Sequence, residues 1–216
     1  MPTATELCIY YEALRSYYAG RAPERNENSP PFERVLRVIA GFGKADAVLG
    51  NLRGGLPAGE VLTPAALAAM PDVALERALR PAGLAGSKLR KVRGLLNVLA
   101  GGASMADVPA FRRELVSMRG FGRESADAVA LHALDYPVFA VNARTYRLLK
   151  RHGFVGEDAG YAEMQDLFQG VLPEEAGVYK EYYHLIRQLA ADFCRAAKPL
   201  CAGCPLKGYM EYEPDD

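Results

Sequence analysis

The sequence predicts an all-α fold, and three observations support this class. Apolar residues recur at intervals of three and four along most of the chain, which is the period of an amphipathic helix. Short segments containing glycine or proline separate these stretches. Alternating strand patterns between tight turns are lacking, and only residues 138–141 suggest extended backbone.

Periodicity and capping residues place each helix. We expect Thr63, Asp72 and Ser87 to be N-caps, because their side-chain oxygens can accept from the first free amides of a helix. Residues 21–31 are polar and contain proline, which predicts a loop. The expected helices cover residues 7–18, 32–39, 64–70, 73–79, 88–100, 108–118, 123–134, 141–151, 161–171 and 179–197.

Length and composition bound the class of protein. The 216 residues allow one large domain or two small ones, and a hydrophobic content of 50% excludes a disordered chain. No apolar run reaches the roughly 18 residues of a membrane span, so we expect no membrane partner. The first residues lack the basic and apolar regions of a secretory signal, which predicts a cytoplasmic location.

The formal net charge is zero, but the charges are unevenly distributed. Between Arg77 and Arg123 basic residues dominate, and the acidic residues there are only Asp107 and Glu114. Acidic residues dominate residues 157–181 and 211–216. A basic zone beside acidic zones is typical of a protein that binds a polyanion, and solvated helix faces are the alternative.

A glycine turn lies between two expected helices at residues 118–126. Gly120 and Gly122 allow a sharp turn, and Phe121 between them can pack back between the helices. The next helix begins with outward amides and a positive dipole end, which bind a phosphate without reading any base, and Arg119 and Arg123 add charge there. This segment resembles the helix-hairpin-helix DNA-binding motif, and a simple tight turn is the alternative.

The cysteines form a second cluster. Cys194, Cys201 and Cys204 are separated by six and two residues, and Cys8 lies far away in the sequence. Clustered cysteines in a chain without a secretory signal suggest a metal centre before a disulfide. Zinc or an iron–sulfur cluster could be held, and free thiols are the alternative.

Both clusters resemble the endonuclease III family of DNA glycosylases, the iron–sulfur branch of the helix-hairpin-helix superfamily that also includes 3-methyladenine glycosylases. The resemblance covers residues 32–205 and implies two helical lobes with a central cleft. One lobe would be a helical barrel of residues 31–134 that carries the hairpin. Residues 1–30 and 135–216 would form the other, with the cysteine loop at 194–210. Further matching stretches are residues 79–88, 124–127 and 179–194.

The resemblance implies a [4Fe-4S] cluster on Cys194, Cys201 and Cys204. The fourth cysteine of the family falls on Met210 here, and a thioether is a poor substitute for a thiolate. Cys8 could be the fourth ligand if the N-terminal helix packs on this loop. Tyr209 or an oxygen donor among residues 211–213 could supply the ligand instead, or the fourth position could be open or altered.

The family's two catalytic positions are altered. Glu124 stands where bifunctional members carry the lysine that attacks the sugar C1′, and a carboxylate forms no Schiff base. Asn142 stands where the family has the aspartate that stabilises the sugar cation or activates water, and it can also cap the helix of residues 143–151. Glu124, Asp127 or Asp46 could replace that carboxylate, and Glu124 is the best placed.

A third departure affects base flipping. The family's glutamine, which fills the gap left by the flipped base, is absent from residues 39–46. Phe42 could take this role, and the glycines at 41 and 43 form either a plain tight turn or a second phosphate-binding turn.

These expectations give two functions. One is a base-excision repair glycosylase with weak or narrow activity and no efficient lyase step; the other is a DNA-binding relative without enzymatic activity. Double-stranded DNA is the expected partner of a nucleoid-associated monomer. The expected DNA-binding residues are Lys88, Arg119, Gly120, Phe121, Gly122, Arg123, Ser125 and Arg144.

Overall fold

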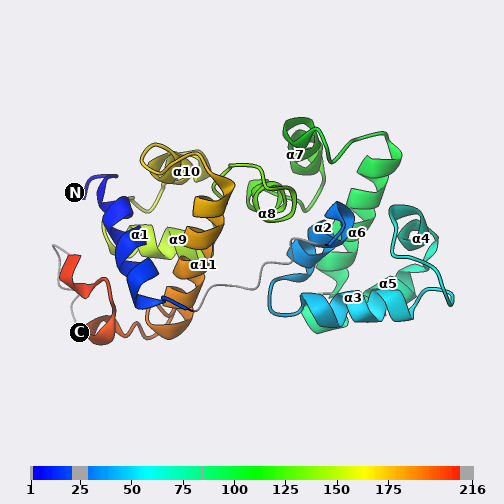
Figure 1. The fold of residues 1–216 in the computed structure, drawn as a ribbon, viewed down its shortest axis with the longest axis horizontal. Coiled ribbons are helices and arrows are strands. Elements are labelled where there is room, and N and C mark those ends of the chain that lie inside the picture. Colours follow the sequence, from blue (N-terminus) through cyan, green and yellow to red (C-terminus); the bar gives the residue numbers. More distant parts are fainter. Residues whose placement is uncertain (1, 21–28, 84, 210–216) are drawn as a thin grey trace. The chain divides into compact units, whose positions relative to one another are not determined.

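The computed structural model describes residues 2–20, 29–83 and 85–209, and within these ranges its regular structure is entirely helical (Figure 1). The predicted all-α class is therefore confirmed. The chain divides into two compact units, one of Asn26–Tyr136 and one of Met1–Arg25 with Pro137–Asp216. In the described part of the chain, no helix is both long and apolar enough to cross a membrane.

The unit of residues 26–136 is a cluster of helices around one apolar core. Helix α2 packs against α8 and α3, and α7 and α8 pack on each other as the two arms of the hairpin. Apolar side chains from α2, α3, α5, α6, α7 and α8 meet in a continuous core. Its helices are α2 (Pro31–Ala40), α3 (Ala45–Gly54), α4 (Pro64–Ala69), α5 (Asp72–Leu79), α6 (Ala85–Ala100), α7 (Val108–Ser117) and α8 (Arg123–Leu134), with a 3-10 turn η1 (Arg80–Ala82).

The other unit joins the N-terminal helix to the C-terminal part of the chain. Helices α1 (Glu6–Tyr17) and α9 (Ala143–Arg151) both pack on α11 (Ala176–Asp192), and α10 (Tyr161–Gln169) lies between α9 and α11 in the chain. The rings of Phe139 and Phe168 stack with centroids 4.0 Å apart. Two 3-10 turns follow, η2 (Cys201–Gly203) and η3 (Lys207–Tyr209).

The local capping rules succeeded at some helix starts and failed at others. Thr63 accepts from the Ala66 amide, as predicted. Asp72 is not an N-cap: α5 begins at this residue after Pro71, and its carboxylate binds Arg93 instead. Ser87 is not one either, because α6 already begins at Ala85.

Other boundaries also differ from expectation. Helix α3 was not foreseen, although it buries four apolar residues. Helix α11 covers Ala176–Asp192 rather than residues 179–197, so that Cys194 lies just beyond its end. Residues 138–141 have no helical assignment and form no strand in the part of the chain described.

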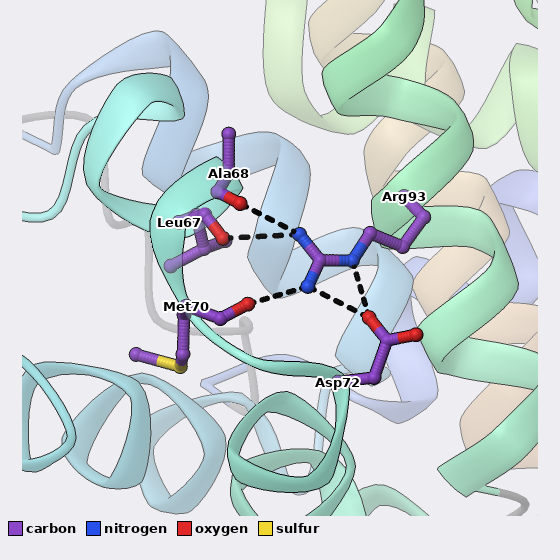
Figure 2. Close-up of polar contacts among 5 residues, drawn as sticks. All are labelled: Leu67, Ala68, Met70, Asp72 and Arg93. Atoms are coloured by element: carbon purple, nitrogen blue, oxygen red, sulfur yellow. Dashed lines mark hydrogen bonds and ion pairs between the residues drawn. The ribbon is translucent and has the colours of Figure 1, made fainter.

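Arg93 on α6 holds the C-terminal end of α4 in place (Figure 2). Its guanidinium donates to the carbonyls of Leu67 (3.3 Å), Ala68 (3.1 Å) and Met70, and to the Asp72 carboxylate (2.7 Å). The last carbonyls of a helix have no intrahelical partner, so one side chain satisfies this helix end and links α4, α5 and α6.

Arg93→Met is expected to lower the free energy of unfolding by about 2–3 kcal/mol, because three carbonyls and a carboxylate lose a charged donor while the apolar stem is kept. Urea unfolding followed by circular dichroism measures this change. Arg90→Met is the matched control, since Arg90 is exposed one turn earlier on the same helix. If the two substitutions lowered the free energy of unfolding equally, Arg93 would have no special role at the end of α4.

Candidate functional site

The turn between α7 and α8 needs one of its two glycines for its backbone. Gly120 has φ of +88°, a conformation that side chains with a Cβ rarely adopt. Gly122 has φ of −65° and ψ of 173°, which is ordinary extended backbone, so the expectation that both glycines serve the turn holds only for Gly120. Helix α8 then begins at Arg123, directly after the turn.

Phe121 anchors this turn from inside, as predicted. Its side chain is 1% exposed and belongs to the apolar core. The Phe121 amide donates to the Met118 carbonyl. Its ring therefore supports the turn and is not presented at the surface, which changes the expected role of Phe121 among the DNA-binding residues.

Two lysines of α6 lie beside the start of α8. Lys91 Nζ donates to Ser125 Oγ at 2.6 Å and lies 5.4 Å from the centroid of the Phe121 ring. Burial lowers the pKa of Lys91 and of Lys88, and the nearby Glu124 carboxylate opposes this shift in both. The structure thus places two predicted DNA-binding residues, Lys88 and Ser125, close to each other at the hairpin. Lys91 lies there as well and was not among the predicted residues.

The remaining hairpin residues are at the surface. Arg119, Gly120, Gly122, Arg123 and Glu124 are all exposed. The amides of Arg123 and Glu124 at the start of α8 have no intrahelical acceptor and form the positive end of the helix dipole, whereas the Ser125 amide donates to the Gly122 carbonyl at 3.0 Å. Sequence reasoning did not select Lys91, although its position one turn after Lys88 on the same face of a helix was the available signal.

Of the three carboxylates considered as catalytic substitutes, two are engaged elsewhere. Asp127 is 0% exposed and pairs with Arg112. Asp46 pairs with Arg37 at 2.7 Å. Glu124 is exposed at the first turn of α8, within electrostatic range of Lys88 and Lys91.

Asn142 is the N-cap of α9, as predicted. Its Oδ1 accepts from the amides of Arg144 at 2.8 Å and Thr145 at 3.1 Å. Asn142 is buried, whereas Arg144 beside it is exposed. Glu124 belongs to the unit of residues 26–136 and Asn142 to the other unit.

Phe42, considered for the flipped-base gap, lies in the short connection between α2 and α3. Its side chain is exposed, and its ring contacts that of His132 edge-on with the centroids 4.8 Å apart. Gly41 has φ of +95° at the end of α2, so the segment is a tight turn between two helices. Whether Phe42 enters a duplex stays a prediction.

The cysteine loop follows α11 and is tied to α9 by two arginines. Arg147 Nε donates to the Cys194 carbonyl at 2.9 Å. Arg151 donates to Cys194 Sγ at 3.4 Å and to the carbonyls of residues 195 and 196. Burial raises the pKa of the Cys204 thiol, and the neighbouring Cys194 and Cys201 raise it further.

The three loop thiols are therefore electrostatic neighbours, but they are not arranged as a finished metal site. In the described residues, no group of three or more His, Cys, Asp or Glu side chains is gathered so that it could hold a metal ion. The donor set nevertheless fits a cluster, because three thiols lie on one short loop and Arg151 can donate to a cluster-bound sulfur.

The candidates for a fourth ligand differ in their surroundings. Cys8 Sγ donates to the Val171 carbonyl at 3.2 Å. Tyr209 is exposed, and its ring lies 6.1 Å from that of Tyr10. Met210 lies outside the described residues.

Two histidines of the unit that contains α9 and α11 are partly buried. His152 Nδ1 lies 2.7 Å from the Tyr10 hydroxyl, and burial followed by the charge of Arg151 lowers its pKa to about 4. Burial, then Arg187 and Lys180, lower the pKa of His184 to about 4. Both imidazoles are therefore neutral at physiological pH.

Known proteins resemble this chain along most of its length. It is 29% identical over 215 residues to the "Putative DNA repair glycosylase" of Methanocaldococcus jannaschii, covering 92% of this chain and 93% of that protein. It is 28% identical over 182 residues to endonuclease III of Bacillus subtilis, covering 83% of this chain and 80% of that protein. The chain is endonuclease III-like. No protein-family model matches it.

The fold of this endonuclease III-like chain has a counterpart among solved structures. A trapped covalent intermediate of endonuclease III with DNA matches it with a TM-score of 0.77 at 24% identity, covering 98% of this chain and 97% of that one. At this level of identity the likeness establishes the fold. The resemblance inferred from the hairpin and the cysteine spacing is therefore confirmed.

Proposed function

We propose that this protein binds damaged double-stranded DNA in base-excision repair. On this proposal it hydrolyses the N-glycosidic bond weakly or narrowly, without an efficient lyase step. The observation that carries the proposal is the hairpin, where Gly120, the start of α8, Lys91 and two exposed arginines converge. Outward amides and cations at one turn are suited to a backbone phosphate. Relatives named endonuclease III support the same class of substrate. The monomeric state, the cleft and the nucleoid location stay predictions.

Each DNA-binding residue has a stated role in this proposal. The amides at Gly120, Gly122 and Arg123 would hold the phosphate oxygens, and Ser125, whose amide donates to the Gly122 carbonyl at 3.0 Å, would contribute its hydroxyl. Arg119, Arg123, Lys88 and Arg144 would contribute charge, and Phe121 would support the turn from the core. Because these contacts address phosphates, they give affinity and position without sequence preference.

The double variant Arg119→Met with Arg123→Met is expected to weaken duplex binding at least about tenfold and to reduce the salt slope of log K by about two, because two phosphate contacts are lost. Fluorescence anisotropy with a labelled duplex over a salt series measures both quantities. Arg77→Met, an exposed arginine on α5, is the control and should change neither. Unchanged affinity and slope in the double variant would refute the hairpin as the binding site.

The proposed chemistry follows from the two altered positions. Glu124 has no amine, so it cannot attack C1′ to form a Schiff base. As an exposed carboxylate beside two lysines it can orient water or stabilise positive charge on the sugar. Asn142 carries no charge, and losing a catalytic carboxylate raises the barrier by several kcal/mol, a factor of roughly 10³ or more in rate.

The protein is therefore expected to give no rapid borohydride-trapped adduct with an abasic duplex. Glu124→Lys should create one by supplying an amine, and Glu124→Gln is the control that should not. Asn142→Asp should raise excision of an oxidised pyrimidine or an alkylated purine toward the roughly 10³-fold that the carboxylate contributes. Gel separation of the cleaved strands quantifies each product. Rapid trapping by the unaltered protein would overturn the proposal.

A [4Fe-4S] cluster is proposed on Cys194, Cys201 and Cys204, with the fourth ligand open. When bound, the cluster would cross-link the loop to the end of α11 and contribute no bond-breaking chemistry. Arg147 and Arg151 would orient the Cys194 segment from α9, and the Arg151 donor would stabilise negative charge on its sulfur.

Purified protein is expected to be coloured, with a broad absorbance near about 400 nm and iron bound. Cys204→Ser should lose both, because a ligand thiolate is removed. Cys8→Ser tests the fourth position: retained iron would exclude Cys8 as the fourth ligand, and lost iron would support it. A colourless protein that binds zinc stoichiometrically would refute the iron–sulfur assignment.

A non-enzymatic damage-recognition protein is the second candidate function. Asn142 in place of a carboxylate and the missing glutamine favour it. Such a protein would bind duplex DNA through the same hairpin. The Asn142→Asp variant would then still show no detectable excision. The excision assay above distinguishes the two functions.

A further inference from the structure

The cap of α9 leaves one polar atom unmatched. Because Asn142 Oδ1 accepts from two backbone amides, the orientation of the side-chain amide is fixed and Nδ2 is the remaining atom. Asn142 is 5% exposed, and Nδ2 is buried without a hydrogen-bond partner among the described residues. A buried donor in this state is unfavourable, and native structures contain few of them.

A second polar atom in the same turn shares this condition. Thr145 is 0% exposed, and within the described part of the chain its Oγ1 has no hydrogen-bond partner. The Arg144 and Thr145 amides are already satisfied by Asn142 Oδ1, so Asn142 Nδ2 and Thr145 Oγ1 are the polar atoms of this turn that a hydrogen-bond acceptor would still serve.

The charge around this helix start is positive. Arg144 is exposed in the first turn of α9, and Arg187 is half-buried on α11, against which α9 packs. Burial lowers the pKa of Arg187; Tyr183 opposes that shift and Arg144 adds to it, so the two guanidinium groups lie within electrostatic range. Lys180 and Arg187 also act on His184, which adds no charge of its own at neutral pH.

We propose that Asn142, Arg144 and Arg187 form a phosphate-binding site at the start of α9. Asn142 Nδ2 donates to a phosphate oxygen, and the two arginines and the helix dipole neutralise its charge. This inference rests on the proposed function for the source of the phosphate, which is then the DNA backbone. The site lies in a different unit from the hairpin and is a second, separate phosphate contact.

The amide nitrogen of Asn142 makes the proposed site prefer an anion to a cation. An aspartate there would offer only acceptor atoms and a negative charge, which attract a cation and repel a phosphate. An asparagine keeps the cap through Oδ1 and offers a donor through Nδ2. Because Nδ2 is buried, a phosphate reaches it only when the side chains that cover it move.

Titration of ¹⁵N-labelled full-length protein with inorganic phosphate tests the site. The Asn142 side-chain amide and the Arg144 backbone amide are expected to shift together and to saturate. Asn142→Asp should weaken phosphate binding at least about tenfold, as expected when one charge-assisted hydrogen bond is lost and a like charge is added. Asn142→Gly removes the donor without adding charge and should weaken binding less, and Arg113→Met on α7 is the neutral control.

Two results would overturn the proposal: no saturable shift at either amide, or equal phosphate affinity in Asn142→Asp and the unaltered protein. A parallel titration with duplex DNA identifies the source. A shift at Asn142 with both probes supports a backbone phosphate, and a shift with inorganic phosphate alone supports a free phosphate at the same site. Failure of the hairpin variants to weaken duplex binding would refute the proposed function and leave the phosphate titration intact.

Discussion

Hydrogen bonding at the ends of short helices is the constraint on which this structure depends. Most of its helices have between six and twelve residues, so a large share of their backbone groups lies in terminal turns without intrahelical partners. Side chains supply the missing partners. Arg93 satisfies the end of α4, Arg151 binds the carbonyls that follow α11, and Asn142 caps the start of α9. The turn after α7, where one helix end and one helix start meet, is the place where such amides can serve a ligand instead.

The need for hydrogen-bond partners at helix ends also affects how the basic zone of residues 77–123 is interpreted. In the basic middle of the sequence, some arginines already bind groups of the protein itself. Arg93 binds backbone carbonyls and Asp72, and Arg112 pairs with the buried Asp127. A count of charges along the chain therefore overstates the surface potential. Several arginines of this zone remain exposed, and Arg119 and Arg123 among them flank the turn, so the argument for a polyanion depends on where the exposed cations lie and not on the total.

The sequence could predict features that depend on neighbouring residues, but not contacts between residues far apart in the chain. The fold class, the inward Phe121 and the Asn142 cap follow from local rules of period, turn and capping, and these predictions are confirmed. Asp72 and Ser87 were wrong as caps because tertiary contacts and helix extension overrode a local preference. The sequence offered Lys91 as a neighbour of Lys88 on one helix face, but its contact with Ser125, 34 residues away, could not be predicted, and neither could the approach of Arg187 to Arg144. Only the packing of α6 on α8 and of α9 on α11 brings these residues together.

Asn142 links the chemistry and the electrostatics of the chain. A carboxylate at this position would serve a sugar that becomes positively charged, because opposite charges attract strongly where water is excluded. The amide keeps the same oxygen on the same two backbone amides, so the helix start is preserved while the charge disappears. The nitrogen that replaces the second oxygen is then a buried donor in the same helix start as Arg144. On the two proposals above, the amide at position 142 removes the partner of a cation and provides a partner for an anion, so that one side chain would account for both weak excision and phosphate binding.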